Sequence, residues 1–312
     1  MREVYETLVG ELDKYVVGYK DLLKLMIVAL LSEGHILVEG FPGTGKTVTA
    51  RLLSMTIGGV FRRIHMTPDL LPSDIIGSYY YDIGRGEWVL RQGPIFSNIL
   101  LVDEINRAPP RTQTALLEAM QEGKVSIEGR LYDLPKPFLV IATQMTSPGE
   151  GIYNLTPALL DRFAYSYRTT YPDPESEIEI LRRVDSIDDT LRSGKLSNIL
   201  NPSVIVETQK IIREIYVSDY VKKYIVDLVN KIRENTELLI PPSPRTSIWL
   251  LKGSRVLAYL EGSDYVAPDH VKMISEYVIL HRIILKPEAE LRNVKPRDIL
   301  DRALREVPVP KI

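Results

Sequence analysis

Eight consecutive residues near the start of the chain have the types and spacing needed to bind the phosphates of a nucleotide. Residues 40–47 read Gly-Phe-Pro-Gly-Thr-Gly-Lys-Thr and fit the P-loop pattern G-x-x-x-x-G-K-[ST]. In such a loop, backbone N–H groups and the N-terminus of the following helix surround the anion. Lys46 is expected to reach the β- and γ-phosphates, and the Thr47 hydroxyl to ligate Mg²⁺. The loop residues predicted to contact the nucleotide are Pro42, Gly43, Thr44, Gly45, Lys46, Thr47 and Val48.

Two adjacent carboxylates, Asp103 and Glu104, follow an apolar run at residues 99–102. This pattern is typical of a buried strand whose end meets a ligand, because ligands of open α/β sheets bind at the carboxyl ends of the strands. Asp103 is expected to hold Mg²⁺, directly or through water, and Glu104 to orient and polarise the attacking water. An acidic turn after a strand is the alternative interpretation, but the P-loop upstream favours a hydrolytic site.

Strands and helices alternate around these motifs. A strand at 35–39 leads into the P-loop and a helix at 48–57 follows it, which is the context that the motif requires. Further strands are predicted at 61–66, 98–102, 138–143 and 164–170, and further helices at 3–15, 21–31 and 111–121. Two β-hairpins are predicted near 78–90 and 124–134. The alternation predicts an α/β fold with a parallel sheet covered on both faces.

Beyond Glu175 the pattern is helical throughout, and no further strand is predicted. The predicted helices span 175–184, 203–213, 218–233, 244–261, 268–282 and 296–305. The proline-containing segment 171–174 marks the boundary between them and the α/β part. We therefore predict two domains, an α/β nucleotide-binding core at 1–172 and a helical domain at 173–312.

Composition excludes several kinds of chemistry. The 312 residues carry a net charge of −2, so no global attraction to nucleic acid or anionic membrane is expected. The chain has no cysteine, which excludes disulfides, thiolate metal sites and a cysteine nucleophile. The four histidines lack metal-ligand spacing and are expected to be structural. The start does not read as a signal peptide, and the longest apolar run is too short to span a bilayer, so a cytoplasmic protein is expected.

Beyond the P-loop, the ordered motifs resemble those of the MoxR group of AAA+ ATPases, nearly end to end. The most diagnostic is Asp-Glu-Ile-Asn-Arg-Ala-Pro-Pro at residues 103–110. Further matching phrases lie at 67–74, 93–96, 117–122, 160–163 and 243–245. The resemblance implies an AAA+ core with a five-stranded parallel sheet in the order 5-1-4-3-2 and an all-helical lid. It also implies ATP and Mg²⁺ as cofactors and a ring-shaped homo-oligomer, usually a hexamer, with ATP bound between subunits.

The resemblance assigns roles to residues outside the two motifs. Arg162 matches the arginine finger, which would reach the ATP of a neighbouring subunit. On its own, Arg162 would be interpreted as the partner of Asp161 in a surface ion pair. Val17 and Gly18 match the segment that lines the adenine.

Arg245 matches the sensor 2 arginine of the family. Ser243 is a plausible N-cap and Pro244 a plausible first residue of the helix, which places Arg245 in the first helical turn. A cation there is unfavourable against the helix dipole, which suggests a purpose such as a phosphate contact. The sequence leaves open whether Arg245 serves its own nucleotide site or that of a neighbour.

The chain departs from the family pattern at one position. After residues 141–144 the family usually has Asn-Pro, and the Asn is the sensor 1 residue that helps to hold the attacking water. This chain has Met145-Thr146, and methionine cannot donate a hydrogen bond. Thr143, Gln144 or Thr146 could substitute, or hydrolysis could be slow. ATP binding is expected in either case.

Three functions are compatible with these observations. The resemblance favours a chaperone-like ATPase that remodels or matures protein complexes, together with a partner carrying a von Willebrand factor A domain and a client protein. A nucleotide-gated scaffold with little turnover is the second possibility, and Met145 is its support. A nucleic-acid motor is the third, but the basic stripe that it needs is missing. The tyrosines at 79–81 predict either a surface that grips a client or simple cross-strand packing.

Overall fold

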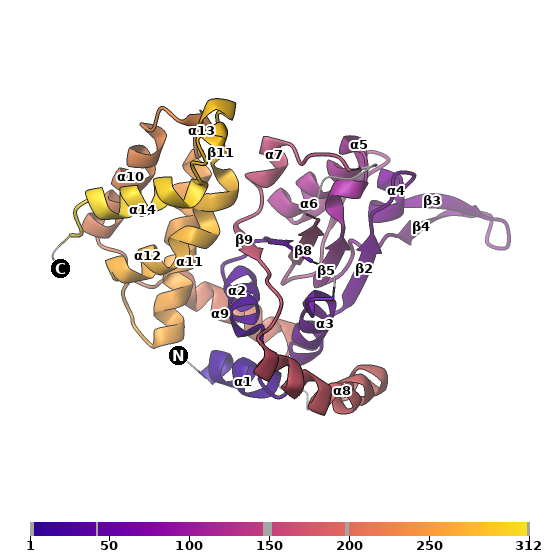
Figure 1. Ribbon diagram of the computed structural model, residues 1–312. Coiled ribbons are helices and arrows are strands. Elements are labelled where there is room, and N and C mark those ends of the chain that lie inside the picture. The colour runs from indigo at the N-terminus through magenta and orange to yellow at the C-terminus, as the bar shows by residue number, and fades with distance from the viewer. Residues whose placement is uncertain (1–2, 42, 146–151, 197–199, 311–312) are drawn as a thin grey trace.

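The computed structural model describes residues 3–41, 43–145, 152–196 and 200–310. Pro42 and Thr146, both named among the candidate site residues, lie outside this part of the chain. A five-stranded parallel sheet forms the centre of the α/β part (Figure 1). Its strands are β1 (Ile36–Glu39), β2 (Phe61–His65), β5 (Ile99–Asp103), β8 (Leu139–Gln144) and β9 (Tyr165–Arg168).

The strand order across this sheet is β2-β5-β8-β1-β9. Counting only these five strands along the chain, the order reads 5-1-4-3-2 from the β9 edge, and the predicted topology is confirmed. Every neighbouring pair is parallel. All five carboxyl ends therefore point to the same edge, where the P-loop follows β1 and Asp103 closes β5.

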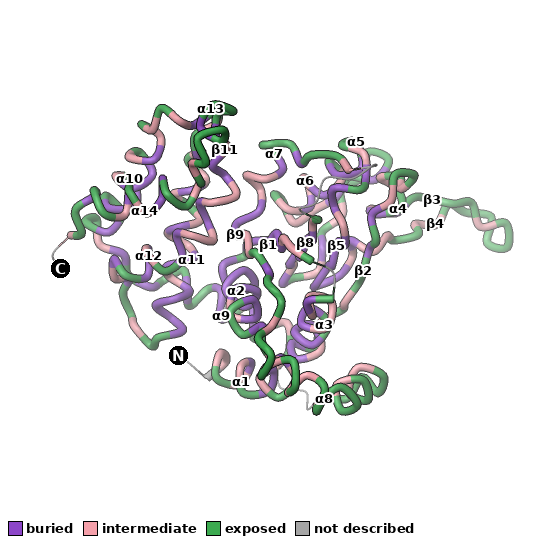
Figure 2. Tube along the Cα trace, viewed as in Figure 1, coloured by how far each residue is buried: buried purple, intermediate pink, exposed green. Residues whose placement is uncertain are grey.

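Successive residues of the central strands enter different hydrophobic clusters on the two faces of the sheet. Ile99 and Leu101 pack with α2 (Lys20–Leu31) and α3 (Lys46–Thr56). Leu100 and Val102 pack with α6 (Ala115–Glu122) on the other face. This alternation follows from the two-residue period of a strand, and it buries both faces of the sheet (Figure 2).

The remaining helices of the α/β part are short or peripheral. They are α1 (Glu3–Leu12), α4 (Pro72–Ile76), α5 (Pro110–Gln113) and α7 (Pro157–Leu160), with the 3₁₀ turn η1 at Ile105–Arg107. The helix predicted at 111–121 is divided at Thr114 into α5 and α6. The helix predicted at 3–15 ends earlier, at Leu12.

Both predicted hairpins are present. One consists of β3 (Gly77–Asp82) and β4 (Glu87–Gln92), and it projects away from the body of the molecule (Figure 1). The other consists of β6 (Lys124–Ile127) and β7 (Arg130–Asp133). The hydroxyl groups of Tyr79 and Tyr132 are hydrogen-bonded to each other, so the two hairpins are joined at their bases rather than independent.

The second half of the chain is mainly helical, as predicted. Its helices are α8 (Pro174–Ser193), α9 (Pro202–Arg213), α10 (Asp219–Arg233), α11 (Pro244–Glu261), α12 (Pro268–Ile279), α13 (Pro287–Leu291) and α14 (Pro296–Glu306). Helix α8 is twice as long as predicted, and α13 was not predicted. Both α8 and α9 bond to the first half of the chain: Arg183 donates to the carbonyl of Asp13, just after α1, and Gln209 donates to the carbonyl of Leu30 in α2. The domain boundary at 172/173 stays a prediction.

The expectation that no strand follows Glu175 is wrong. Strands β10 (Leu238–Ile240) and β11 (Ile284–Leu285) pair antiparallel. Runs of two and three apolar residues are too short for periodicity to separate a strand from a helix end. The helix predicted at 268–282 accordingly ends at Ile279, and the 3₁₀ turn η2 (Leu280–Arg282) leads into β11. Among the described residues, no helix is long and apolar enough to cross a membrane.

Candidate nucleotide-binding site

The P-loop connects β1 to α3 and takes a backbone path that its glycines permit. Gly40, Gly43 and Gly45 have φ angles of 132°, 79° and 66°, in the region that favours glycine. A Cβ atom on Gly40 would lie 2.2 Å from Oγ1 of Thr169, so the loop also needs the small residue for space. Helix α3 begins directly afterwards at Lys46, and its free N–H groups therefore open toward the loop.

Lys46 folds back over the loop that it follows. Its Nζ atom donates to the carbonyl of Phe41 at 2.5 Å and to Oγ1 of Thr44 at 2.8 Å. Burial lowers the pKa of Lys46, and the negative charge of the Asp103 carboxylate opposes this shift. The loop carbonyl and hydroxyl therefore hold the ammonium group at the mouth of the P-loop.

Asp103 and Glu104 occupy the same carboxyl edge, at the end of β5. The buried Asp103 carboxylate accepts a hydrogen bond from Thr143 at 3.4 Å and pairs with Nε of Arg63 at 2.5 Å. Glu104 has a φ angle of 55°, and its N–H donates to Oγ1 of Thr143 at 3.0 Å. The left-handed backbone at Glu104 turns the chain sharply after the strand, so adjacent carboxylates point to different partners.

The Glu104 carboxylate lies between two basic side chains. One of its oxygens is 3.2 Å from Nη1 of Arg107 and 3.9 Å from Nε2 of His65. Sequence reasoning missed Arg63, His65 and Arg107 as neighbours of the acidic pair. The predicted strand order could have indicated Arg63 and His65, because it places their strand, β2, beside β5.

The oxygen atoms of the residues predicted to hold Mg²⁺ are suited to that ion when a nucleotide is bound as well. The described part of the chain has no group of three or more His, Asp or Glu side chains that could hold a metal alone. Mg²⁺ at nucleotide sites takes only one or two protein oxygens and several from phosphate and water. The Asp103 carboxylate could supply one such oxygen, and the Thr47 hydroxyl, which makes no hydrogen bond with other described residues, could supply another. A hard-oxygen donor set of this size matches Mg²⁺ bound with ATP.

The sensor 1 position lies at the end of β8, also at the carboxyl edge. The Met145 side chain is 36% exposed, and its carbonyl accepts a hydrogen bond from the Asn106 side chain at 3.1 Å. Two of the three proposed substitutes are already engaged. Thr143 bonds to Asp103 and to the Glu104 N–H, and Gln144 donates to the Glu39 carboxylate at 2.8 Å.

The predicted adenine segment lies beside the P-loop. Gly18 has a φ angle of 76°, and a Cβ atom there would lie 3.1 Å from Cβ of Pro172. The next residue, Tyr19, is so close to the loop that a Cβ on Gly45 would be 3.3 Å from its ring. Val17 and Gly18 are thus held between the P-loop and the start of α8.

Arg162 lies at the opposite edge of the sheet from all of these groups. Strands β1 and β9 are parallel, with Ile36 opposite Tyr165 and Glu39 opposite Arg168. The P-loop follows the carboxyl end of β1, whereas Arg162 precedes the amino end of β9. The structure therefore does not bring Arg162 together with the P-loop of its own chain.

Asp161 bonds to Arg245 rather than to Arg162. Its carboxylate accepts hydrogen bonds from Nη1 of Arg245 at 3.0 Å and from Oγ of Ser243 at 2.8 Å. Arg162 makes no hydrogen bond or ion pair with other described residues, so the simpler interpretation of an Asp161–Arg162 pair is wrong. Partial burial and the charge of Arg245 lower the pKa of Arg162, while the charge of Asp161 acts in the opposite direction.

The predicted start of α11 is confirmed. Oγ of Ser243 accepts a hydrogen bond from the Arg245 N–H at 3.1 Å, and Pro244 is the first helical residue. Arg245 therefore lies in the first turn of α11, beside Asp161 and, like Arg162, away from its own P-loop.

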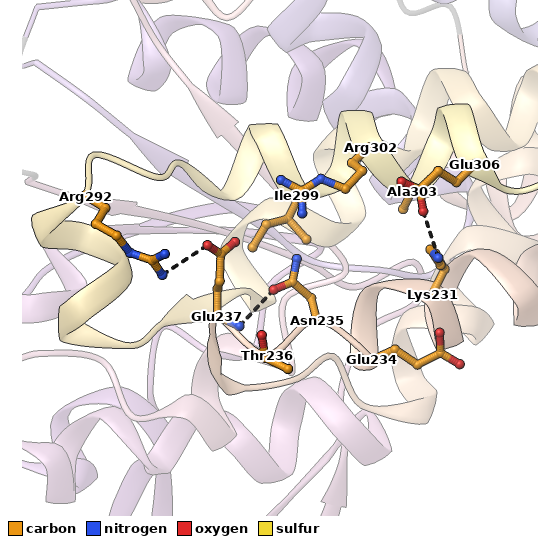
Figure 3. Close-up of a pocket in the computed structure, with 10 residues that line it drawn as sticks. All are labelled: Lys231, Glu234, Asn235, Thr236, Glu237, Arg292, Ile299, Arg302, Ala303 and Glu306. Carbon is orange, nitrogen blue, oxygen red and sulfur yellow. Dashed lines mark hydrogen bonds and ion pairs between the residues drawn. The ribbon is translucent and has the colours of Figure 1, made fainter.

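A separate cavity of about 460 Å³ lies on the helical half, between α10, α13 and α14 (Figure 3). Its walls are charged, but most of the charges are paired within the cavity. Lys231 lies 2.7 Å from the Glu306 carboxylate and Arg292 lies 3.2 Å from that of Glu237. None of the residues predicted to bind ATP lines this cavity.

Comparison with known proteins assigns this architecture to a class. The chain matches the model of the ATPase family associated with various cellular activities (AAA) over residues 35–165, and that of the AAA lid domain over 231–303. It also superposes with a TM-score of 0.91 on the crystal structure of a Cytophaga hutchinsonii protein assigned as an ATPase. The two are 36% identical, and the match covers 99% of this chain and 97% of that one. The fold is an α/β AAA+ core with a helical lid.

Two relatives narrow the class to a family. Chaperone MoxR1 of Mycobacterium tuberculosis is 38% identical over 98% of this chain and 82% of its own length. The uncharacterized protein YeaC of Bacillus subtilis is also 38% identical, over 97% of this chain and 93% of its own. The chain belongs to the MoxR family of AAA+ ATPases, and the resemblance inferred from its motifs is confirmed.

Proposed function

We propose that this protein binds and hydrolyses ATP with Mg²⁺ in a ring of identical subunits, and that the ring remodels client proteins. One observation carries the proposal: the P-loop, Asp103 and Glu104 meet at the carboxyl edge of one parallel sheet. Such an arrangement matches what phosphoryl transfer needs, namely a phosphate cradle, an acidic metal ligand and a group that positions the nucleophile.

Each residue of the carboxyl edge has a distinct part in this reaction. Lys46 and the N–H groups of α3 hold the phosphates, and binding exchanges the contacts of Lys46 with Phe41 and Thr44 for contacts with phosphate oxygen. Asp103 and Thr47 would hold Mg²⁺, which neutralises the charge that develops on the phosphates. Glu104 accepts a proton from the attacking water and orients it, and Arg107 and His65 limit where its carboxylate can swing.

Arg162 and Arg245 complete the site of a neighbouring subunit in this proposal. Their distance along the sheet from the P-loop of their own chain supports action across an interface, since both lie near the amino edge. The absence of any described partner for Arg162 leaves its guanidinium available for a phosphate. Hydrolysis then depends on assembly, because the two arginines of a subunit do not lie at the P-loop of the same subunit.

The client and partner are inferred from the family. The relative MoxR1 carries the name of a chaperone. We infer the same class of action here, with a von Willebrand factor A domain protein as partner. The projecting β3–β4 hairpin supports contact with a client, because Tyr80, Tyr81 and Trp88 are 47%, 51% and 67% exposed. Tyr81 and Trp88 also pack edge to face across the two strands.

A nucleotide-gated scaffold with little turnover is the second candidate. It is favoured by the sensor 1 position, where Met145 offers no donor and where Thr143 and Gln144 are committed to other partners. Binding of ATP would then drive assembly, and slow hydrolysis would end it.

Steady-state ATP hydrolysis measured against protein concentration tests both candidates, with the mass of the assembly determined with and without ATP. A rate per subunit that rises as the protein assembles supports the proposed ATPase. Tight ATP binding with negligible turnover in the assembled form would instead favour the scaffold. Absence of ATP binding would overturn both.

A further inference from the structure

Arg282 is a buried arginine that lies outside the P-loop and the other family motifs of the chain. It ends the 3₁₀ turn η2 between α12 and β11, and its side chain is 2% exposed. Burial lowers the pKa of Arg282 to about 10, with the charge of Asp161 acting in the opposite direction, so it stays protonated at neutral pH. A buried cation is costly unless it is paired and fully hydrogen-bonded, which directs attention to its partners.

The partners of Arg282 are concentrated on one four-residue segment, 161–164. Nε donates to the Asp161 carboxylate at 3.1 Å, and Nη2 donates to the carbonyls of Asp161 at 3.2 Å and Phe163 at 2.5 Å. Nη1 donates to the carbonyl of Ala164 at 3.2 Å. Outside the segment, Nη1 also donates to the carbonyl of Val278 on α12 and lies 2.9 Å from Nε2 of His281. One planar guanidinium thus fixes the backbone on both sides of Arg162, while the Arg162 side chain itself stays without a described partner.

Arg282 is also linked to Arg245, because both donate hydrogen bonds to Asp161. The same carboxylate that accepts from Arg282 accepts from Arg245 and Ser243, at the first turn of α11. The position of the Arg245 guanidinium therefore depends on an acceptor that Arg282 holds in place. Only arginine can serve here, because a lysine ammonium lacks the fork of five donors that spans a side chain and several carbonyls.

We propose that Arg282 is a positioning residue for catalysis across the subunit interface. It sets segment 161–164, and through Asp161 it sets Arg245, so that Arg162 and Arg245 reach the neighbouring ATP as one unit. The inference rests on the proposed function and concerns how Arg162 and Arg245, the arginines proposed to act across the interface, are held in position. Arg282 and Arg245 come from the helical half and Arg162 from the α/β part, so these contacts join the two parts of the chain next to Arg162.

The test is Arg282→Lys, which keeps the charge and removes the fork. ATP affinity, measured with a fluorescent ATP analogue, is expected to stay within about twofold of wild type, because the P-loop lies at the other edge of the sheet. The kcat is expected to fall by about 10²-fold with little change in KM, the scale of loss expected when a catalytic group is misplaced by about 1 Å. A parallel loss of ATP affinity would overturn the proposal.

Mixed assemblies separate positioning from general damage. Lys46→Ala subunits carry intact Arg282 and Arg162, so mixing them with Arg282→Lys subunits should restore turnover at the intact P-loops. Mixing Arg282→Lys with Arg162→Ala should restore none, because neither subunit presents a working finger. No restoration with Lys46→Ala, in assemblies of normal size, would overturn the inference.

Two further variants keep the test decisive. Arg233→Lys is the matched control: Arg233 also donates to a lid carbonyl, that of Pro242 at 2.8 Å, but makes no contact with segment 161–164. It should leave kcat unchanged, and an equal loss of kcat in Arg233→Lys would overturn the specific role of Arg282.

If Arg282→Lys does not fold, Asp161→Asn should give the same pattern of affinity, turnover and rescue. Absence of turnover in wild-type assemblies would instead refute the proposed function itself.

Discussion

Arg162 and Lys46 lie at opposite edges of the same parallel sheet. Lys46 follows β1 at its carboxyl end, and Arg162 precedes β9, which runs parallel to β1 and pairs with it directly. A strand of four residues is about 13 Å long, and β1 and β9 each lie between the edge that Lys46 follows and the edge that Arg162 precedes. This placement is the basis of the proposal that Arg162 acts on the nucleotide of another subunit.

Replacing Arg162 with alanine should therefore abolish turnover without affecting the nucleotide site of the same chain. We expect ATP affinity to be retained and kcat to fall by about 10³-fold or more, as for other arginine fingers. Assemblies that mix Arg162→Ala with Lys46→Ala should recover part of the activity, because an intact finger can meet an intact P-loop. Steady-state assays over a range of mixing ratios check this. Inactivity at every ratio would contradict action across the interface.

Lys46→Ala should weaken nucleotide binding rather than slow turnover alone. The phosphates lose the point charge now held by the Phe41 carbonyl and Thr44 hydroxyl. A hydrogen bond to a charged group contributes about 1.5–3 kcal/mol, so Kd should rise roughly ten- to hundredfold. Fluorescent-nucleotide titration measures the change. Lys222→Ala, at an exposed ion pair on α10, should leave Kd unaltered.

Glu104→Gln should retain ATP binding and abolish hydrolysis, which traps the ATP-bound assembly. The substitution keeps the shape of the side chain but removes the group that accepts the proton from water. Single-turnover hydrolysis and the mass of the assembly with ATP together report the trapped state. The exposed Glu122 at the end of α6 supplies the control, since Glu122→Gln should hydrolyse normally. A wild-type rate in Glu104→Gln would show that Glu104 is not the catalytic glutamate.

The fold could be predicted from the sequence where long patterns and motifs specify it. The P-loop fixed the junction of β1 and α3, and the alternation of strands and helices, with the family resemblance, gave the sheet order. The short strands β10 and β11 could not be predicted because two or three apolar residues carry no period. Their pairing joins segments that are more than 40 residues apart in the sequence, which is a tertiary contact.

The candidate site was predictable where its residues are consecutive or belong to a motif. Asp103, Glu104, Arg162 and Arg245 were all found in this way, although their roles stay predictions. Arg282 carried no signal, because its partner Asp161 is 121 residues away and its isolated sequence context is ordinary. The pairing of Arg63 with Asp103 likewise arises from the contact between β2 and β5, which is tertiary.

Met145→Asn should raise kcat by supplying the missing sensor 1 donor. Thr143 and Gln144 already bond to Asp103 and Glu39, which holds their side chains away from the role of the missing Asn. ATP affinity should stay unchanged, because Met145 lies outside the phosphate cradle. Comparing kcat of Met145→Asn with that of Met145→Leu, which adds no donor, isolates the effect. Equal rates in all three proteins would mean that another residue already fills the role.

His35 gives the core a dependence on pH that is separate from the site. Its Nδ1 atom accepts a hydrogen bond from the Val140 N–H at 3.1 Å, and its Nε2 atom lies 3.0 Å from the Met120 carbonyl. The backbone thus requires a neutral ring with the proton on Nε2. Burial lowers the pKa of His35 to about 4. The hydrogen bond to the Met120 carbonyl opposes this shift, because it favours the charged form of the ring.

The unfolded chain therefore takes up a proton on His35 near pH 6.5, whereas the folded protein resists until about pH 4. The contribution of His35 to stability is complete above pH 6.5 and is lost as the pH falls from 6.5 to 4, by up to about 1.4 kcal/mol per pH unit. Urea unfolding at pH 7, 6 and 5 measures this slope. His35→Gln should start less stable at pH 7 but lose less on acidification. Val140→Ala should cost about 1–3 kcal/mol at pH 7 and keep the wild-type slope, because the backbone N–H that fixes the tautomer remains. Parallel curves for wild type and His35→Gln would show that His35 does not set the acid sensitivity.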